Sequence, residues 1–124
     1  DMLRFEGETG PYVQYTHARA CSLLRKGDWQ EDSKIDLHGE EEWAIIKELQ
    51  EFPEVVRKAC EKYDPSLVAK YAINLAQTFN KYYGEVRILA DDEQKNSRLT
   101  LVYCVTVVLE EALRLLGLGA PKEM

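Results

Sequence analysis

Two tyrosines, Tyr12 and Tyr15, are the first residues of this chain whose type and spacing could serve a ligand. Pro11 is suited to the first position of a helix, where its missing N–H costs nothing, so a helix is expected to begin there. Residues three apart then project from one side of its first turn, beside unpaired N–H groups and the positive end of the helix dipole. Such a surface could stack the bases and hold a phosphate of a single-stranded RNA loop.

The same spacing is also typical of half-buried core residues, so both interpretations of the tyrosine pair remain open on spacing alone. His17 and Arg19 follow on the same helix. A lone histidine on a helix is more often a hydrogen-bonding, structural or interface residue than a general base, and we expect that of His17.

The elements that must position these residues are helices. Apolar spacing predicts an all-α fold, a five-helix bundle with almost no strand. Pro53 is expected to separate the second helix from the third, Asp64-Pro65 to cap and start the fourth, and Gly84 and Gly117 to stop the last two. The helices are expected over about residues 11–26, 40–51, 53–63, 65–83 and 92–116.

Before the last helix, residues 85–90 predict a short extended connector, and Asp91 or Asp92 could cap the helix that follows. Each helix carries an apolar stripe, and that of the fourth is the most regular. The residues expected to be buried are Val13, Ala20, Leu23 and Leu24, then Trp43, Ile46 and Leu49, then Val56, Ala59 and Cys60, then Val68, Tyr71, Ala72, Leu75, Ala76, Phe79 and Tyr82, and finally Leu99, Val102, Tyr103, Thr106, Leu109, Leu113 and Leu116.

The composition is that of one soluble globular domain spanning residues 1–124, with 45% hydrophobic and 31% charged residues. The net charge of −6 argues against a non-specific nucleic-acid binder, which is normally basic. It is compatible with a specific RNA-binding domain that stacks several bases and contacts few phosphates.

The spacing of the cysteines and histidines and the shortness of the apolar runs argue against several other classes of protein. The three cysteines form no Cys-x-x-Cys pair and lie far from His38, so neither a zinc site nor a disulfide scaffold is expected. Buried or half-buried free thiols in a reducing cytoplasm are the simplest account. No apolar run is long enough to predict a transmembrane helix.

No catalytic motif is recognisable in the chain. Gly117 and Gly119 follow a predicted helix instead of opening one after a strand, so they form no phosphate-binding loop. Neither a serine nucleophile elbow nor a His-Glu-x-x-His pair is present. We therefore expect no catalytic residue and no metal ligand in this chain.

Four separated segments carry a resemblance to a known family. They are residues 6–15 (Glu-Gly-Glu-Thr-Gly-Pro-Tyr-Val-Gln-Tyr), 79–83 (Phe-Asn-Lys-Tyr-Tyr), 96–102 (Asn-Ser-Arg-Leu-Thr-Leu-Val) and 112–124 (Ala-Leu-Arg-Leu-Leu-Gly-Leu to Ala-Pro-Lys-Glu-Met). In this order they resemble the DALR-type anticodon-binding domain at the C-terminus of arginyl-tRNA synthetase. Its Asp-Ala-Leu-Arg signature is matched with Glu111 in place of aspartate, and Met124 is expected to be the natural C-terminus.

The resemblance implies a fragment of a larger class I synthetase, which ligates arginine to its tRNA with ATP and Mg²⁺. The His-x-Gly-His and Lys-Met-Ser-Lys-Ser signatures of that class are absent here, so the catalytic domain is expected upstream and the fragment alone to be inactive. The fragment itself is expected to need no cofactor. The implied partners are an arginine tRNA, through its anticodon loop, and the catalytic domain in cis, in a cytoplasmic monomer.

The resemblance also implies which residues meet the RNA. Tyr12, Tyr15 and Tyr83 match tyrosines that contact anticodon-loop bases, and Met124 matches a C-terminal methionine near the anticodon. Arg87 stands where some relatives have tryptophan, and its guanidinium plane could stack instead. The other two candidates are polar neighbours, Asn80 and Arg19.

A different class of function is compatible with the same residues. Tyrosine and arginine are also enriched at protein interfaces, so the tyrosine face could belong to a helical protein–protein interaction module. Composition does not separate this alternative from RNA binding.

Overall fold

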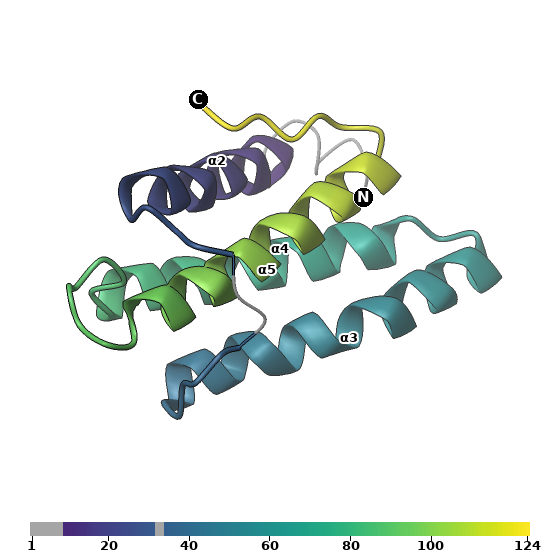
Figure 1. The fold of residues 1–124 in the computed structure, drawn as a ribbon. Helices are drawn as coiled ribbons and strands as arrows, with labels where there is room; N and C mark the ends of the chain where they lie inside the picture. Colours follow the sequence, from purple (N-terminus) through teal and green to yellow (C-terminus); the bar gives the residue numbers. More distant parts are fainter. Residues whose placement is uncertain (1–8, 32–33) are drawn as a thin grey trace.

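The computed structural model describes residues 9–31 and 34–124, and within them the regular secondary structure is helical, with no strand. Residues 6–8 of the first family-like segment lie outside this described part. Figure 1 shows the four helices, which are α2 (Gly10–Lys26), α3 (Glu40–Lys62), α4 (Ser66–Glu85) and α5 (Lys95–Leu115). The predicted all-α class is confirmed.

The helices α4 and α5 form the centre of the domain. They contact each other, and each also packs against α2 and α3. In Figure 1 α2 lies on one side of this central pair and α3 on the other, and the segment after α5 runs back along α2. The outward-facing surfaces of α2 and α3 therefore lie on opposite sides of the domain.

The prediction of five helices is wrong, because the expected second and third helices are one continuous helix, α3, with Pro53 inside it. Proline in a helix interior removes one hydrogen bond and crowds the preceding turn, which is why a break was expected. Packing on both sides of Pro53 outweighs that cost.

Tyr71 of α4 shows how the segment before the proline is held. Its hydroxyl donates a hydrogen bond to the carbonyl of Glu48, and its ring lies 5.3 Å from that of Phe52, measured between centroids. Beyond the proline, Ala59 is buried in the same core. Both halves of α3 are thus fixed against the central helices, and the helix continues through Pro53.

The predicted helix ends are largely found. The Asp64 carboxylate accepts a hydrogen bond from the Ser66 N–H (3.0 Å) at the start of α4. After α5, Gly117 adopts a positive φ of 77°, and Leu118 N–H donates to the Leu113 carbonyl at 2.8 Å. With the bond from the N–H of Gly117 to Arg114 this is a Schellman motif, which favours glycine at that position.

Between α4 and α5 the prediction needs correction. The helix α4 runs through Gly84 to Glu85, and residues 87–90 form a turn closed by the Ala90 N–H and the Arg87 carbonyl (3.0 Å), not an extended connector. The helix α5 begins at Lys95, later than expected, because Asp92 uses its carboxylate to accept from Gln94 N–H in the turn before it.

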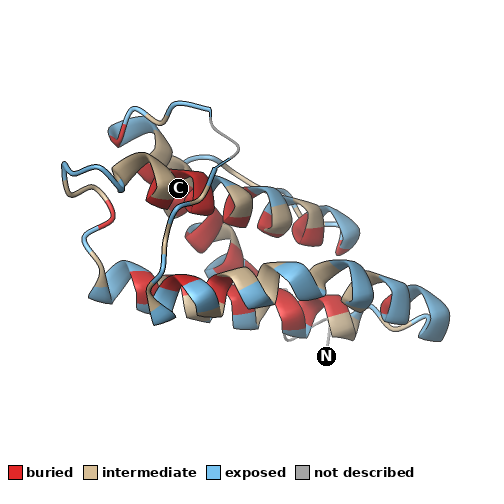
Figure 2. Cartoon of the chain, turned by 60° about the horizontal axis from the view of Figure 1, so that its bottom comes forward, coloured by how far each residue is buried: buried red, intermediate tan, exposed pale blue. Residues whose placement is uncertain are grey.

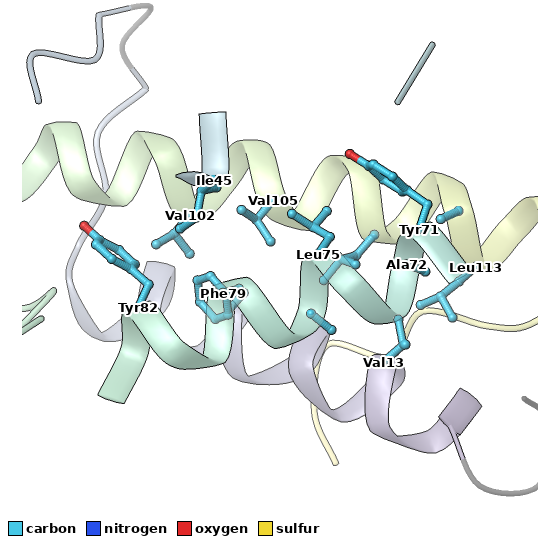
Figure 3. Close-up of a cluster of buried hydrophobic side chains, with 14 of the residues drawn as sticks. Val13, Ile45, Tyr71, Ala72, Leu75, Phe79, Tyr82, Val102, Val105 and Leu113 are labelled. Carbon is cyan, nitrogen blue, oxygen red and sulfur yellow. The ribbon is translucent and has the colours of Figure 1, made fainter. Parts of the chain in front are cut away.

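Buried residues gather on the faces by which the helices meet, as Figure 2 shows. Every residue of the predicted α4 stripe, from Val68 to Tyr82, is buried. Figure 3 shows several of them, including Leu75, Phe79 and Tyr82, interlocked with Val102 of α5. All four helices contribute to this one core.

Three residues expected in the core are exposed. Trp43 is 54% exposed, whereas Ile45 is fully buried. The buried face of α3 is therefore centred on Ile45, and a three-residue spacing of apolar residues did not distinguish this face from one that contains Trp43. Cys60 is exposed on the same helix. Tyr103 is exposed on α5 and stacks on Trp29, with ring centroids 4.5 Å apart.

The described residues offer neither a membrane-spanning helix nor a metal-binding cluster. None of these helices combines the length and the apolar character that crossing a membrane requires. Across 9–31 and 34–124, no cluster of three or more His, Cys, Asp or Glu side chains is arranged to hold a metal ion.

Replacing Pro53 by alanine should raise the free energy of unfolding by about 1–3 kcal/mol, because it restores a helical N–H and relieves crowding. Urea denaturation measures the change. Gly84→Ala is a matched control in α4, where an added Cβ meets nothing within 4 Å and a gain of about 0.5–1 kcal/mol is expected. A loss of stability in Pro53→Ala would show that the core requires a bend at this proline.

The three cysteines should differ in reactivity. Burial raises the pKa of the Cys21 and Cys104 thiols, so at pH 8 a smaller fraction of each is thiolate, whereas Cys60 is exposed. Iodoacetamide labelling followed by mass spectrometry should modify Cys60 first, about tenfold faster than the other two. In denaturant the three rates should converge. Equal rates in the folded protein would contradict this assignment.

Candidate nucleic-acid interface

Both tyrosines of the opening helix are accessible, so the core interpretation of this pair is wrong. Tyr12 is 38% and Tyr15 52% exposed, and Tyr83 at the end of α4 is 42% exposed. The stripe of α2 that does enter the core carries Val13 and Ala20. The tyrosines lie on a neighbouring stripe of the same helix.

Arg19 lies between two of these rings. Its guanidinium carbon is 4.3 Å from the centroid of the Tyr83 ring and 5.5 Å from that of Tyr15. Stacking a guanidinium on an aromatic face is favourable because the cation meets the negative face of the ring. Residues from α2 and α4 thus form one row of flat groups.

Asn80 of α4 links this row of side chains to α2. Its Oδ1 accepts a hydrogen bond from Arg19 Nη1, and its Nδ2 donates to the Tyr12 hydroxyl and to Thr16 Oγ1, each at 2.9 Å. Both amide hydrogens and the amide oxygen are therefore used within the protein. Asn80 thereby fixes the side chains of Arg19, Tyr12 and Thr16 on α2.

A cavity of about 380 Å³ opens beside these side chains. It joins four of the predicted site residues, Tyr15, Arg19, Tyr83 and Met124, although they come from two helices and the chain end. The other residues lining it are Ala18, Ser22, Leu23, Arg25, Lys26, Lys122 and Glu123.

Arg87, exposed on the turn after α4, borders a second hollow of about 390 Å³ that Tyr83 also lines. The buried side chain of Arg98 on α5 holds the turn that carries Arg87. It donates hydrogen bonds to the carbonyls of Ile88 (3.0 Å) and Ala90 (2.7 Å). Arg98 also pairs with Asp92 (3.1 Å), and this bond lowers the pKa of the Asp92 carboxyl.

The chain end reaches the cavity because α2 side chains bind its backbone. Gln14 Nε2 lies 2.9 Å from the Gly119 oxygen, His17 Nδ1 2.8 Å from that of Pro121, and Arg25 Nη1 3.3 Å from that of Lys122. His17 is 1% exposed and takes the structural, hydrogen-bonding role expected of it. These bonds lay the tail along α2, where Met124 lines the same cavity as Tyr15.

Charge is distributed unevenly over the domain. The helix α2 carries Arg19, Arg25 and Lys26 and no Asp or Glu, whereas α3, on the opposite side of the central pair, begins Glu40-Glu41-Glu42 and carries further glutamates. Although the net charge is −6, the face of α2 beside the tyrosines is basic, because it carries Arg19, Arg25 and Lys26 and no carboxylate.

The cations Arg25, Lys26 and Lys122 were not predicted as site residues. At the end of a helix, Arg25 and Lys26 resemble ordinary partners of the helix dipole, and only the fold brings Lys122 beside them. The α2 residues lining the cavity run from Tyr15 to Lys26, so side-chain cations, not the N–H groups of the first turn, offer the anion contacts there.

Comparison with known proteins shows the family of the chain. Residues 13–124 match the family described as the DALR anticodon binding domain. The chain belongs to this family.

The DALR domain described here has close relatives of known name. It is 59% identical over its whole length to Arginine--tRNA ligase 1 of Bacillus cereus and to Arginine--tRNA ligase of Enterococcus faecalis, and it spans 22% of the length of each. Among solved structures, Thermus thermophilus arginyl-tRNA synthetase superposes on 97% of the chain, and on 22% of its own, with a TM-score of 0.87 and 38% identity. The resemblance found in the sequence is confirmed.

The family-like segments divide into structural and surface parts. In the signature of the DALR domain, Ala112 and Leu113 are buried in the core, and Glu111 pairs with Arg114 on the surface. The pairing needs a carboxylate at position 111, which glutamate supplies as aspartate would.

The segment 96–102 also has a structural task. Asn96 exchanges two hydrogen bonds with the backbone of Gln30, both 3.0 Å, and Ser97 accepts from the Asp36 N–H (3.1 Å). These bonds fasten the loop after α2 to the start of α5.

Removing the Asn80 side chain should destabilise the DALR domain by about 1–3 kcal/mol, because Arg19 and Thr16 lose a partner. Urea denaturation of Asn80→Ala, Tyr12→Phe and the double variant should give a coupling of about 0.5–1.5 kcal/mol for the Asn80–Tyr12 bond. Asn74→Ala, on the exposed side of α4, is the control and should change stability by less than about 0.5 kcal/mol. Additive effects would show that the amide does not hold the Tyr12 hydroxyl.

Proposed function

We propose that this DALR domain binds the anticodon loop of an arginine tRNA. The observation that carries the proposal is the single surface on which Tyr15, Arg19, Tyr83 and Met124 border one cavity. Flat aromatic and guanidinium groups next to basic side chains suit unstacked bases and their phosphates.

Each part of the surface has a separate task in this proposal. Tyr15 and Tyr83, with Arg19 stacked between them, offer faces for bases splayed out of the loop, and Met124 closes the cavity as an adaptable apolar contact. Tyr12, whose hydroxyl is held by Asn80, extends the row along α2.

The cations have a different task from the rings. Arg25, Lys26 and Lys122 lie where phosphates of the loop would pass, and the acidic α3 on the far side disfavours RNA there. Arg87 offers a second guanidinium beside Tyr83 for a further base.

We further propose that the domain works as part of an arginine–tRNA ligase. The relatives carry that name and are several times longer than this chain, which supports a catalytic domain elsewhere in the polypeptide that uses ATP and Mg²⁺. In this proposal the isolated domain has no ligase activity, and the whole protein acts as a monomer in the cytoplasm.

The test is a titration of the 124-residue chain with a fluorescent stem-loop of the anticodon arm of an arginine tRNA. Tyr15→Ala and Tyr83→Ala should each weaken binding roughly 5- to 150-fold, since a stacked base contributes about 1–3 kcal/mol. Tyr63→Ala is the matched control: Tyr63 is 93% exposed at the end of α3, away from the cavity, and its loss should leave binding unchanged.

The result also separates RNA binding from protein docking at the same tyrosines. Equal binding of a stem-loop from an unrelated tRNA, or equal losses in all three variants, would contradict anticodon recognition. A chain that binds no stem-loop would leave the tyrosine face to a protein partner.

A further inference from the structure

The last eight residues have a defined path that depends on side chains of α2. Gln14, His17 and Arg25 follow one another along a stripe of this helix, and each bonds a different carbonyl of the tail. Tyr15 and Arg19, which border the cavity, lie on another stripe, and Arg25 reaches the cavity as well. One helix thus holds the chain end with one stripe and presents the stacking groups with another.

His17 is the buried member of the three. The Pro121 oxygen can only accept a hydrogen bond, so the Nδ1 atom at 2.8 Å must carry the hydrogen. The other ring nitrogen is 3.8 Å from Cys21 Sγ and 4.0 Å from the exposed carboxylate of Glu110. The imidazole is thereby fixed on several sides, whereas Gln14 and Arg25 make their bonds at the surface.

The position of the tail decides the shape of the cavity. Lys122, Glu123 and Met124 form the side of it that no helix supplies. Leu116, just before the tail, is buried in the core, and Gly117 turns the chain. Beyond Leu118, whose N–H bonds to Leu113, the hydrogen bonds that hold the tail among the described residues come from side chains of α2.

We propose that His17 is a positioning residue for RNA binding: the hydrogen bond from its Nδ1–H to the Pro121 carbonyl holds the tail so that Lys122, Glu123 and Met124 form one side of the cavity. This inference rests on the proposed function, since it assigns His17 to the binding of the same RNA loop. His17 touches no base; it acts through the tail.

The first measurement concerns the tail and needs no RNA. In the 124-residue chain, His17→Leu removes the donor, and the backbone amides of residues 119, 120 and 122–124 should show fast motion in ¹⁵N relaxation. His17→Asn should restore order, because its amide nitrogen is bonded to Cγ as Nδ1 is and can donate to the same oxygen. Gln14→Ala tests a neighbouring anchor at the surface and serves if His17→Leu does not fold.

The second measurement links the tail to binding of the arginine-tRNA stem-loop. His17→Leu should weaken binding about five- to tenfold, the scale of one lost buried hydrogen bond, and His17→Asn should recover most of it. A chain ending at Leu118 should be weakened at least as much. In that shortened chain, His17→Leu should have no further effect, because the group through which His17 acts is gone.

The outcomes are distinguishable. An ordered tail in His17→Leu, or a further loss of binding when His17→Leu is added to the shortened chain, overturns the positioning role. Failure of His17→Asn to recover binding also counts against the hydrogen bond as the cause. If the unmodified chain binds no stem-loop, the proposed function fails and the RNA role of His17 falls with it, whatever the tail measurements show.

Discussion

Burial of the apolar stripe of α4 is the constraint on which the rest of the structure depends. With Phe79 and Tyr82 packed into the core, the residues that follow each of them are turned by about 100° around the helix. Asn80 therefore points along the edge of the core toward α2, and Tyr83 points outward. The exposure of the Tyr83 ring and the direction of the Asn80 amide thus follow from the packing of the residue directly before each of them.

The helix α2 shows how one element can serve three purposes. Its buried stripe carries Val13 and Ala20, the next carries Tyr12, Tyr15 and Arg19, and a third binds the tail. The 3.6-residue period makes this division possible, because residues three or four apart share a face while their neighbours do not. The absence of acidic residues from α2 adds a charge preference to the same surface.

Several features were predictable because they depend on local physics. The α4 stripe, the bond of the Asp64 carboxylate to the Ser66 N–H before α4 and the left-handed Gly117 follow from spacing and backbone preference, and all three are found. Trp43 and Pro53 were misjudged for one reason: the burial of a side chain and the survival of a helix depend on what packs against them. Tyr71, distant in sequence, contacts α3 just before Pro53, and no local pattern contains that contact.

The candidate site, like the fold, has features that the sequence predicted and features that only the tertiary structure decided. The family-like segments in the sequence identified the candidate residues Tyr12, Tyr15, Tyr83 and Met124, and spacing placed the first two on one helical turn. Only the tertiary structure decided that Tyr15, Tyr83 and Met124 border one cavity, that Lys122 joins Arg25 there, and that His17 bonds the chain end. The reason is physical: helical periodicity is a property of neighbours in sequence, whereas a cavity made by two helices and a tail depends on contacts between residues about a hundred positions apart.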